Sequence, residues 1–131
     1  MDIIEKAEAA VAAAFLYRDA AHTKLAAQTP DAAALQDNQH AAHGYAWLET
    51  TIFALDAVAH WGKRRAKGRT PQNQQAAVPA LVAVLFGEYL AQIIGGIPMS
   101  QTEFVRPADL QLEVEAQKLA DDGAVAWFLQ N

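Results

Sequence analysis

The chain has 131 residues, no cysteine and a formal net charge of -5 at pH 7. These values favour one domain with its own hydrophobic core and exclude disulfides and thiolate metal sites. The acidic balance argues against nucleic-acid binding, and the acidic start lacks the basic, apolar pattern of a secretion signal, so we expect a cytoplasmic protein.

Apolar residues recur at helical spacing along most of the chain, without the sustained alternation of strands. The first helix is predicted over residues 2–27. Thr29-Pro30-Asp31 then reads as a second start, with Thr29 as the cap and Pro30 in the first helical position. This second helix is predicted over residues 30–66, and two adjoining apolar stripes on it suit contact with two neighbours.

Gly68-Arg69-Thr70-Pro71 is expected to end that helix and cap a third, predicted over residues 76–94. Its only strongly polar side chains are Glu88 and Gln92, so we expect it to be buried almost all round. The run is near the length of a membrane span, but Pro79, Glu88 and Gln92 interrupt it. A core helix of a soluble protein is therefore expected, with Pro79 at a kink or at its regular start.

Gly95-Gly96 is predicted to end the third helix through a left-handed cap, and Pro98 prevents its resumption. Residues 100–103 have the spacing of a capping box for one short turn. A fourth helix is predicted from Arg106 to about residue 120, followed by a break at Asp121-Asp122-Gly123 and a last apolar turn. The sequence thus predicts an all-α fold, an antiparallel four-helix bundle forming a single domain over residues 1–131.

Glu88 is the most informative single residue, because a carboxylate in a buried helix must be paired, lie at a groove or be protonated. Gln92 lies one turn further on and could share a hydrogen bond with it. The structural interpretation pairs Glu88 with Arg106 or with a histidine from a neighbouring helix. The functional one makes it a member of a polar site composed of Glu88, Ser100, Glu103 and Arg106.

Half of the ten basic residues lie in one short segment, here called the basic cluster: Lys63, Arg64, Arg65, Lys67 and Arg69. One interpretation is a solvated helix end that complements the negative pole of the helix dipole. The other is an anchor for the phosphates of a ligand such as coenzyme A.

The sequence gives little support for a metal site or for nucleophilic catalysis. Asp37-x-x-His40, with His43 one turn on, approaches half of a di-iron motif, but the second pair is missing, so no metal site is predicted. The serines and threonines stand at predicted caps and turns, and no Gly-x-Ser-x-Gly elbow occurs.

Gln92-Ile93-Ile94-Gly95-Gly96 and the following residues 102–106 resemble a segment in the C-terminal helical domain of acyl-CoA dehydrogenases. Residues 40–50, 86–92 and 95–101 are similar to the helical N-terminal extension of family members of the methylsuccinyl-CoA dehydrogenase type. The resemblance covers roughly residues 1–120 and implies the fold of the family's C-terminal domain. It also implies that Gln92, Gly95 and Gly96 lie where relatives contact the FAD of a partner subunit.

The chain also departs from the family. Pro98 stands where ordinary members have the second glycine of a Gly-x-Gly turn. The Tyr-Glu-Gly segment that carries the catalytic glutamate in many members is missing, and so are the domains that build most of the flavin and acyl-chain pocket. The chain is too short to supply the protein wall that a flavin reaction needs.

Three functions remain open. The first is an accessory or oligomerisation domain, not catalytic alone, with a second copy or a dehydrogenase body as partner and FAD only in that assembly. The second is a small subunit that completes an FAD and acyl-CoA site in trans, with Gln92, Gly95 and Gly96 at the cofactor and the basic cluster at coenzyme A. The third is an interaction protein without a flavin connection.

Overall fold

The computed structural model describes residues 1–68 and 71–131. Within these ranges the chain forms six α-helices, two 3₁₀ turns and one short hairpin. Their bounds are α1 Ile3–Gln28, α2 Ala32–Asp37, α3 Gln39–Lys67, η1 Gln72–Gln74, α4 Ala77–Gly95, β1 Ile97–Pro98, β2 Phe104–Val105, η2 Pro107–Leu110, α5 Glu113–Asp121 and α6 Gly123–Gln130. The predicted all-α fold is confirmed, whereas the detail of four helices is not.

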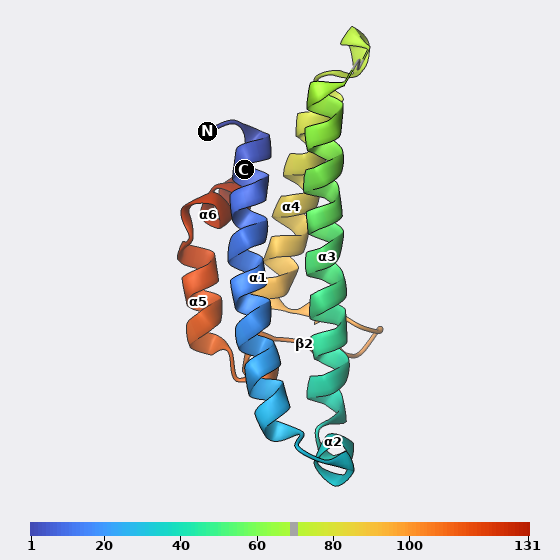
Figure 1. Ribbon diagram of the computed structural model, residues 1–131, viewed down its shortest axis with the longest axis vertical. Coiled ribbons are helices and arrows are strands. Elements are labelled where there is room, and N and C mark those ends of the chain that lie inside the picture. Colours follow the sequence, from blue (N-terminus) through green and yellow to red (C-terminus); the bar gives the residue numbers. More distant parts are fainter. Residues whose placement is uncertain (69–70) are drawn as a thin grey trace.

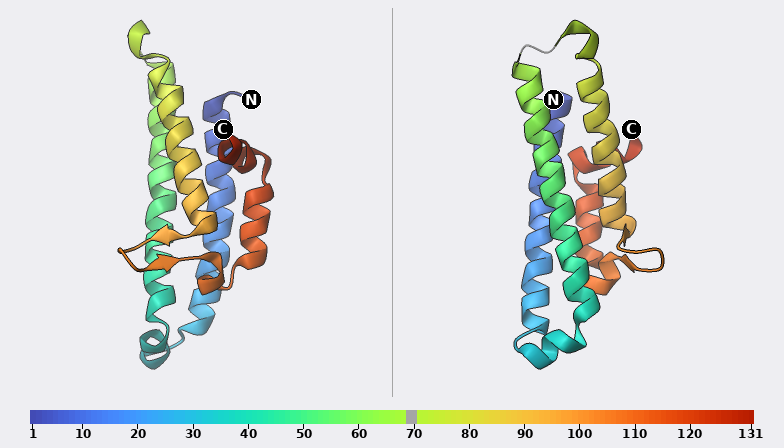
Figure 2. Two further views of the ribbon diagram at one scale, coloured as in Figure 1. Left: turned by 180° about the vertical axis from the view of Figure 1, so that it is seen from behind. Right: turned by 90° about the vertical axis from the view of Figure 1, so that its right-hand side faces the viewer.

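Three long helices, α1, α3 and α4, run side by side along the molecule (Figure 1). The short α2 joins α1 to α3 at one end, and α5 and α6 pack along α1. The hairpin of β1 and β2 follows α4 and extends across α3 (Figure 2, left). Both chain termini therefore lie toward the end of the molecule opposite α2.

Small residues bring the long helices close together. Ala7, Ala10 and Ala14 on α1 are fully buried, and a Cβ added to Gly62 of α3 would lie 2.8 Å from Ile4 Cδ1 and 3.1 Å from Val82 Cγ2. Since such contacts leave no room for a larger residue, α1, α3 and α4 meet around Gly62. The largest fully buried side chains fill the remaining space: Leu48, Ile52, Leu55, Val82, Phe86, Leu90, Ile93, Leu112, Val125 and Phe128.

The predicted second helix is interrupted near its start. Thr29 caps the end of α1, where its hydroxyl donates to the Leu25 carbonyl at 2.7 Å, so its prediction as an N-cap is wrong. Asp31 caps α2 instead by accepting from the Ala34 amide at 2.8 Å. The chain then leaves helical geometry at Asn38, whose side-chain amide donates to the Ala34 carbonyl at 2.8 Å. Such side-chain bonds to the backbone compete with helix continuation.

The third predicted helix is α4, which begins at Ala77. Pro79 therefore lies in the first turn of α4, where its missing amide costs no helical hydrogen bond. Gly96 ends it with a φ of 142°, and its amide donates to the Gln92 carbonyl at 2.7 Å. The expected glycine stop is confirmed. Thr70, predicted to cap this helix, lies outside the described residues.

The segment after α4 forms a hairpin where a helical turn was predicted. Ile97 pairs with Val105 and Pro98 with Phe104 in antiparallel register. The Ser100 hydroxyl accepts from the Glu103 amide at 3.1 Å, so the capping interaction exists but closes a hairpin turn. The predicted fourth helix is likewise divided into η2 and α5, separated by Gln111 with a φ of 58°.

Candidate functional site

The side of α4 that faces away from the other helices is exposed and largely apolar. The inward residues Val78, Val82, Phe86, Leu90 and Ile93 follow helical spacing and are buried. The outward residues form what we call the α4 face: Ala77, Ala80, Leu81, Val84, Glu88 and Ala91. Val84 is 67% exposed and Leu81 is 49% exposed, so the prediction of a helix buried all round is wrong.

The composition explains that error. An α4 that is apolar on every side carries no amphipathic signal for which side faces the core. The helix has the length and composition of a membrane span, with a mean hydropathy of 1.8, while 28% of that window is buried. Seen from behind, no other described segment covers the middle of α4 (Figure 2, left).

Glu88 lies on this face in contact with solvent, not in a buried environment. Its carboxylate accepts from the Gln92 side-chain amide at 3.0 Å, which confirms the expected one-turn pair. The predicted pairing with Arg106 or a histidine is wrong. The Arg106 guanidinium instead lies 5.2 Å from the centre of the Phe104 ring, and the Arg106 amide donates to Asp109 at 2.7 Å.

The structure brings two of the predicted site residues together at the C-terminal end of α4. Gly95 and Arg106 line one open cavity of about 350 Å³, together with Ile94, Pro107, Ala108, Glu113, Ala116, Gln117 and Ala120. Ser100 and Glu103 do not line it, because they form the tip of the hairpin. The predicted polar site is therefore divided between the α4 face, which carries Glu88, a cavity and a hairpin tip.

The glycines at this end do not by themselves fit a flavin. A Cβ added to Gly96 would lie 3.4 Å from Arg106 Cγ and 3.9 Å from Phe104 Cβ, so this chain's own side chains fill that space. The left-handed backbone already accounts for the glycine. Gly95 has no atom within 4 Å of an added Cβ and faces open space.

The basic cluster is divided between two directions. Lys63 reaches across to α1, where its Nζ lies 2.8 Å from Glu8 Oε1, and this bond raises the pKa of Lys63. Arg65 lines a cavity of about 230 Å³ beside the start of α4, with Ile4, Ala66, Gly68, Gln75, Val78 and Pro79. Arg64 and Lys67 are exposed at the same end. Arg69 lies outside the described residues.

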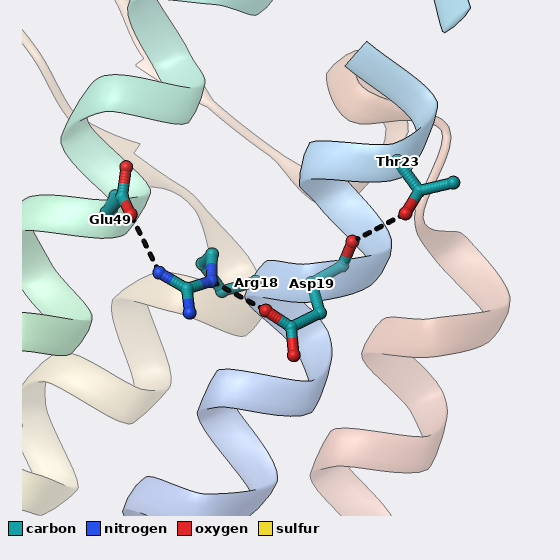
Figure 3. A network of polar contacts seen from close by, with 4 residues as sticks. All are labelled: Arg18, Asp19, Thr23 and Glu49. Carbon is teal, nitrogen blue, oxygen red and sulfur yellow. Dashed lines mark hydrogen bonds and ion pairs between the residues drawn. The ribbon is translucent and has the colours of Figure 1, made fainter. Parts of the chain in front are cut away.

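A polar network between α1 and α3 was not predicted from the sequence. Arg18 Nε lies 2.8 Å from Asp19 Oδ1, and Arg18 Nη1 lies 2.7 Å from Glu49 Oε1 (Figure 3). Burial, followed by the charge of Glu49, raises the pKa of Tyr45. The contact between Arg18 and Glu49 links α1 to α3, and Asp19 holds the same guanidinium from within α1. An arginine and a glutamate 31 residues apart give no sequence signal of such a pair.

The histidines of the incomplete metal motif are separated. His40 Nε2 lies 3.7 Å from Asp109 Oδ2, and His43 Nε2 accepts from the Trp47 indole at 3.2 Å. In the part of the chain that the structure describes, no group of three or more histidine, aspartate or glutamate side chains is arranged to hold a metal ion.

Comparison with known proteins identifies a relative of part of this chain. No family model matches the chain. The chain is 42% identical over 82 residues to a (2S)-methylsuccinyl-CoA dehydrogenase from Cereibacter sphaeroides. The match covers 62% of this chain but only 14% of that enzyme. This chain is therefore a helical domain related to part of an acyl-CoA dehydrogenase.

Proposed function

We propose that the protein is an accessory or oligomerisation domain of the acyl-CoA dehydrogenase type, which acts by packing and is not catalytic alone. The exposed apolar face of α4 carries this proposal. A soluble protein rarely leaves a long apolar strip open unless it is an interaction site. We expect the domain to work with a dehydrogenase body in the cytoplasm, and its similarity to part of a dehydrogenase supports this expectation.

The chemistry of the described residues supports a packing role. The cavity at the end of α4 has about 350 Å³, the low end of the range for small-ligand sites. Its charged side chains include Arg106 and Glu113, but it offers no wall that could position a flavin against a substrate. We expect FAD to belong to the dehydrogenase body in an assembly.

A second candidate function is completion of a flavin and acyl-CoA site in trans. The observation that favours it is the open space beside Gly95, next to Arg106. In this case Gln92, Gly95 and Gly96 would lie at the cofactor, and the exposed Arg64 and Lys67 would meet the phosphates of coenzyme A. Such binding would weaken with salt, because exposed charges are screened.

The test uses the purified chain alone and after co-expression with the full-length Cereibacter sphaeroides enzyme. We expect the chain to be colourless, to lack acyl-CoA oxidation with an artificial electron acceptor, and to associate with itself or with the enzyme. Flavin reduction by the isolated chain on addition of acyl-CoA would overturn the proposal. A monomer that also fails to retain the enzyme would overturn it as well.

Titration of the chain with FAD and with coenzyme A separates the second candidate. The accessory role predicts no binding of either ligand at low or physiological salt. Coenzyme A binding that is lost in Arg64→Ala but kept in Lys118→Ala, a control at the distant α5, would favour completion of a site in trans.

A further inference from the structure

We propose that a cavity between α1 and α5 binds a small aliphatic carboxylate, with Tyr17 and Lys118 as its hydrogen-bond donors. The cavity has a volume of about 300 Å³ and shares no lining residue with the cavity at the end of α4. This inference goes beyond the proposed packing role, because it assigns a ligand to a part of the molecule that the packing role does not use.

The walls of the cavity are the facing sides of α1 and α5, which pack along each other (Figure 1). The residues from α1 lie three and four positions apart and share one side of the helix: Ala13, Leu16 and Tyr17. The residues from α5 have the same spacing: Glu115, Lys118 and Leu119, with Asp122 just after its end. Since Ala13 carries only a methyl group, the two helices leave room between them at this point.

Tyr17 brings to this cavity a hydroxyl that has no partner in the described part of the chain. The residue is 3% exposed, yet its hydroxyl forms no hydrogen bond with the described residues. Every fully enclosed side-chain oxygen or nitrogen of those residues has a partner. The Tyr17 hydroxyl is therefore not fully enclosed and opens onto the cavity that Tyr17 lines. A ligand oxygen there would supply the hydrogen bond that the hydroxyl lacks.

The charges around the cavity favour an anionic ligand group. Glu115 is already compensated, because Lys24 Nζ lies 3.2 Å from its Oε1. Asp122 accepts from two amides of α6 at 3.0 and 3.2 Å, at the positive end of that helix. Lys118 is exposed and forms no hydrogen bond or ion pair with the residues that the structure describes. Its ammonium and the Tyr17 hydroxyl are thus two available donors, and a carboxylate has two oxygens to accept from them.

The remaining wall is apolar and limits the size of the ligand. The side chains of Ala13, Leu16 and Leu119 carry no polar atom, so this part of the cavity suits an alkyl chain. A volume of about 300 Å³ is at the low end of the range for small-molecule sites. A phosphate dianion would bring a second negative charge close to Glu115 and Asp122. A short-chain monocarboxylate such as hexanoate therefore matches both the size and the charge of the cavity.

Titration of the full chain with hexanoate, followed by amide NMR spectra at constant ionic strength, tests the site. We expect saturable shifts in residues 13–17 and 115–122, with a dissociation constant on the order of 1 mM because the ligand has few atoms. Hexylamine has the same alkyl chain and the opposite charge, and it should cause no saturable shift. Saturable shifts of equal size with hexylamine, no saturable shift with hexanoate, or shifts in another part of the protein would overturn the proposal.

Tyr17→Phe tests the hydroxyl, because it keeps the ring and removes the donor. The dissociation constant of hexanoate should rise by about fivefold, the effect of losing one hydrogen bond. Stability toward urea at pH 7 should not fall, since the hydroxyl has no partner among the described residues. The matched control is Tyr89→Phe on α4, where Tyr89 is 39% exposed. Unchanged affinity in Tyr17→Phe would overturn the role of the hydroxyl.

Lys118→Met tests the ammonium and keeps a long side chain in place. The dissociation constant of hexanoate should rise by at least about threefold, a modest change because the lysine is exposed. Lys67→Met at the end of α3 is the control and should leave the affinity unchanged. Equal effects of the two variants would mean that the lysines act only through the net charge, and would overturn the assignment of Lys118.

Filling the cavity tests its location without removing a polar group. Ala13→Leu should abolish the hexanoate shifts, whereas Ala12→Leu, at the adjacent exposed position, should retain them. Circular dichroism should show that both variants remain folded. Hexanoate binding that survives Ala13→Leu would overturn the proposed site. Because association with the dehydrogenase is measured separately, failure of this site would leave the accessory role standing.

Discussion

The α1–α3 contact and the outer side of α4 are two helix surfaces that differ in burial. The first packs against another helix of the chain, whereas the second is exposed. Between α1 and α3, buried alanines allow close approach, and ion pairs from Arg18 to Glu49 and from Lys63 to Glu8 lie along the edge. The outer side of α4 exposes Leu81 and Val84, and no other described segment covers the middle of this helix. The first surface has its partners within the chain, whereas the second is available for a partner outside it.

The inner side of α4 should account for the largest loss of stability on mutation. Phe86 is fully buried and its ring centre lies 4.9 Å from that of Phe128. Phe86→Ala should lower the free energy of unfolding by about 3–5 kcal/mol, because it removes apolar contact and leaves a cavity. Urea denaturation checks this, with Leu81→Ala as the control. Similar losses for the two variants would contradict the assignment of inner and outer sides.

The hairpin should be the next most sensitive feature. A Cβ at Gly44 of α3 would lie 2.4 Å from Val105 Cγ2, so Gly44→Ala should cost about 1–3 kcal/mol through overpacking. Gly95→Ala is the control, because its added Cβ meets no atom within 4 Å. Thermal unfolding of both variants measures the difference. An unaffected Gly44→Ala would mean that the hairpin does not pack tightly on α3.

Local chemistry made much of this architecture predictable from the sequence. The capping box of Asp2 and Glu5 starts α1, Gly96 stops α4, and Asp122 caps α6 by accepting from the Ala124 amide at 3.0 Å. In each case a few adjacent residues determine the backbone. Long-range pairing was not predictable, since nothing near Gly44 in sequence indicates Val105 as its neighbour.

In the candidate site too, local contacts could be predicted from the sequence and long-range contacts could not. The Glu88–Gln92 pair follows from one helical turn. The position of Glu88 on an outer side could not be predicted, because α4 is apolar on its inner and outer sides alike. The split of the basic cluster also depended on tertiary contacts, since only folding brings Lys63 to Glu8.

The pH dependence of stability tests whether Tyr17 is buried on the inner side of α1. Tyr17 is 3% exposed, and burial, followed by the charge of Glu115, raises its pKa above the ordinary value of 10.0. Below pH 10 both the folded and the unfolded chain keep the phenol proton, so the stabilisation is fully present. Above pH 10 the unfolded chain releases the proton first, and stability falls until the folded pKa is reached.

The expected slope is about 1.4 kcal/mol per pH unit from this one group. Urea denaturation from pH 9 to pH 11 measures it, and Tyr17→Phe should remove that part of the alkaline loss. Other groups titrate in the same range, so the difference between the two proteins is the relevant quantity. Identical pH profiles would show that Tyr17 ionises equally easily in both states.

The smallest loss of stability should come from breaking the Arg18–Glu49 pair. This substitution can be compared directly with one on the exposed α4 face. Both side chains are partly exposed, so Glu49→Gln should cost no more than about 1 kcal/mol. Glu88→Gln on the α4 face is the matched control, since among the described residues Glu88 accepts a hydrogen bond from Gln92 alone, and the new amide can keep that bond. Urea denaturation of dilute, monomeric protein should therefore show a loss for Glu49→Gln and almost none for Glu88→Gln. The loss should shrink in 1 M salt, where the Debye length is about 3 Å. Equal effects of the two substitutions would mean that the ion pair adds nothing to the α1–α3 contact, which would then depend on its buried alanines and apolar packing.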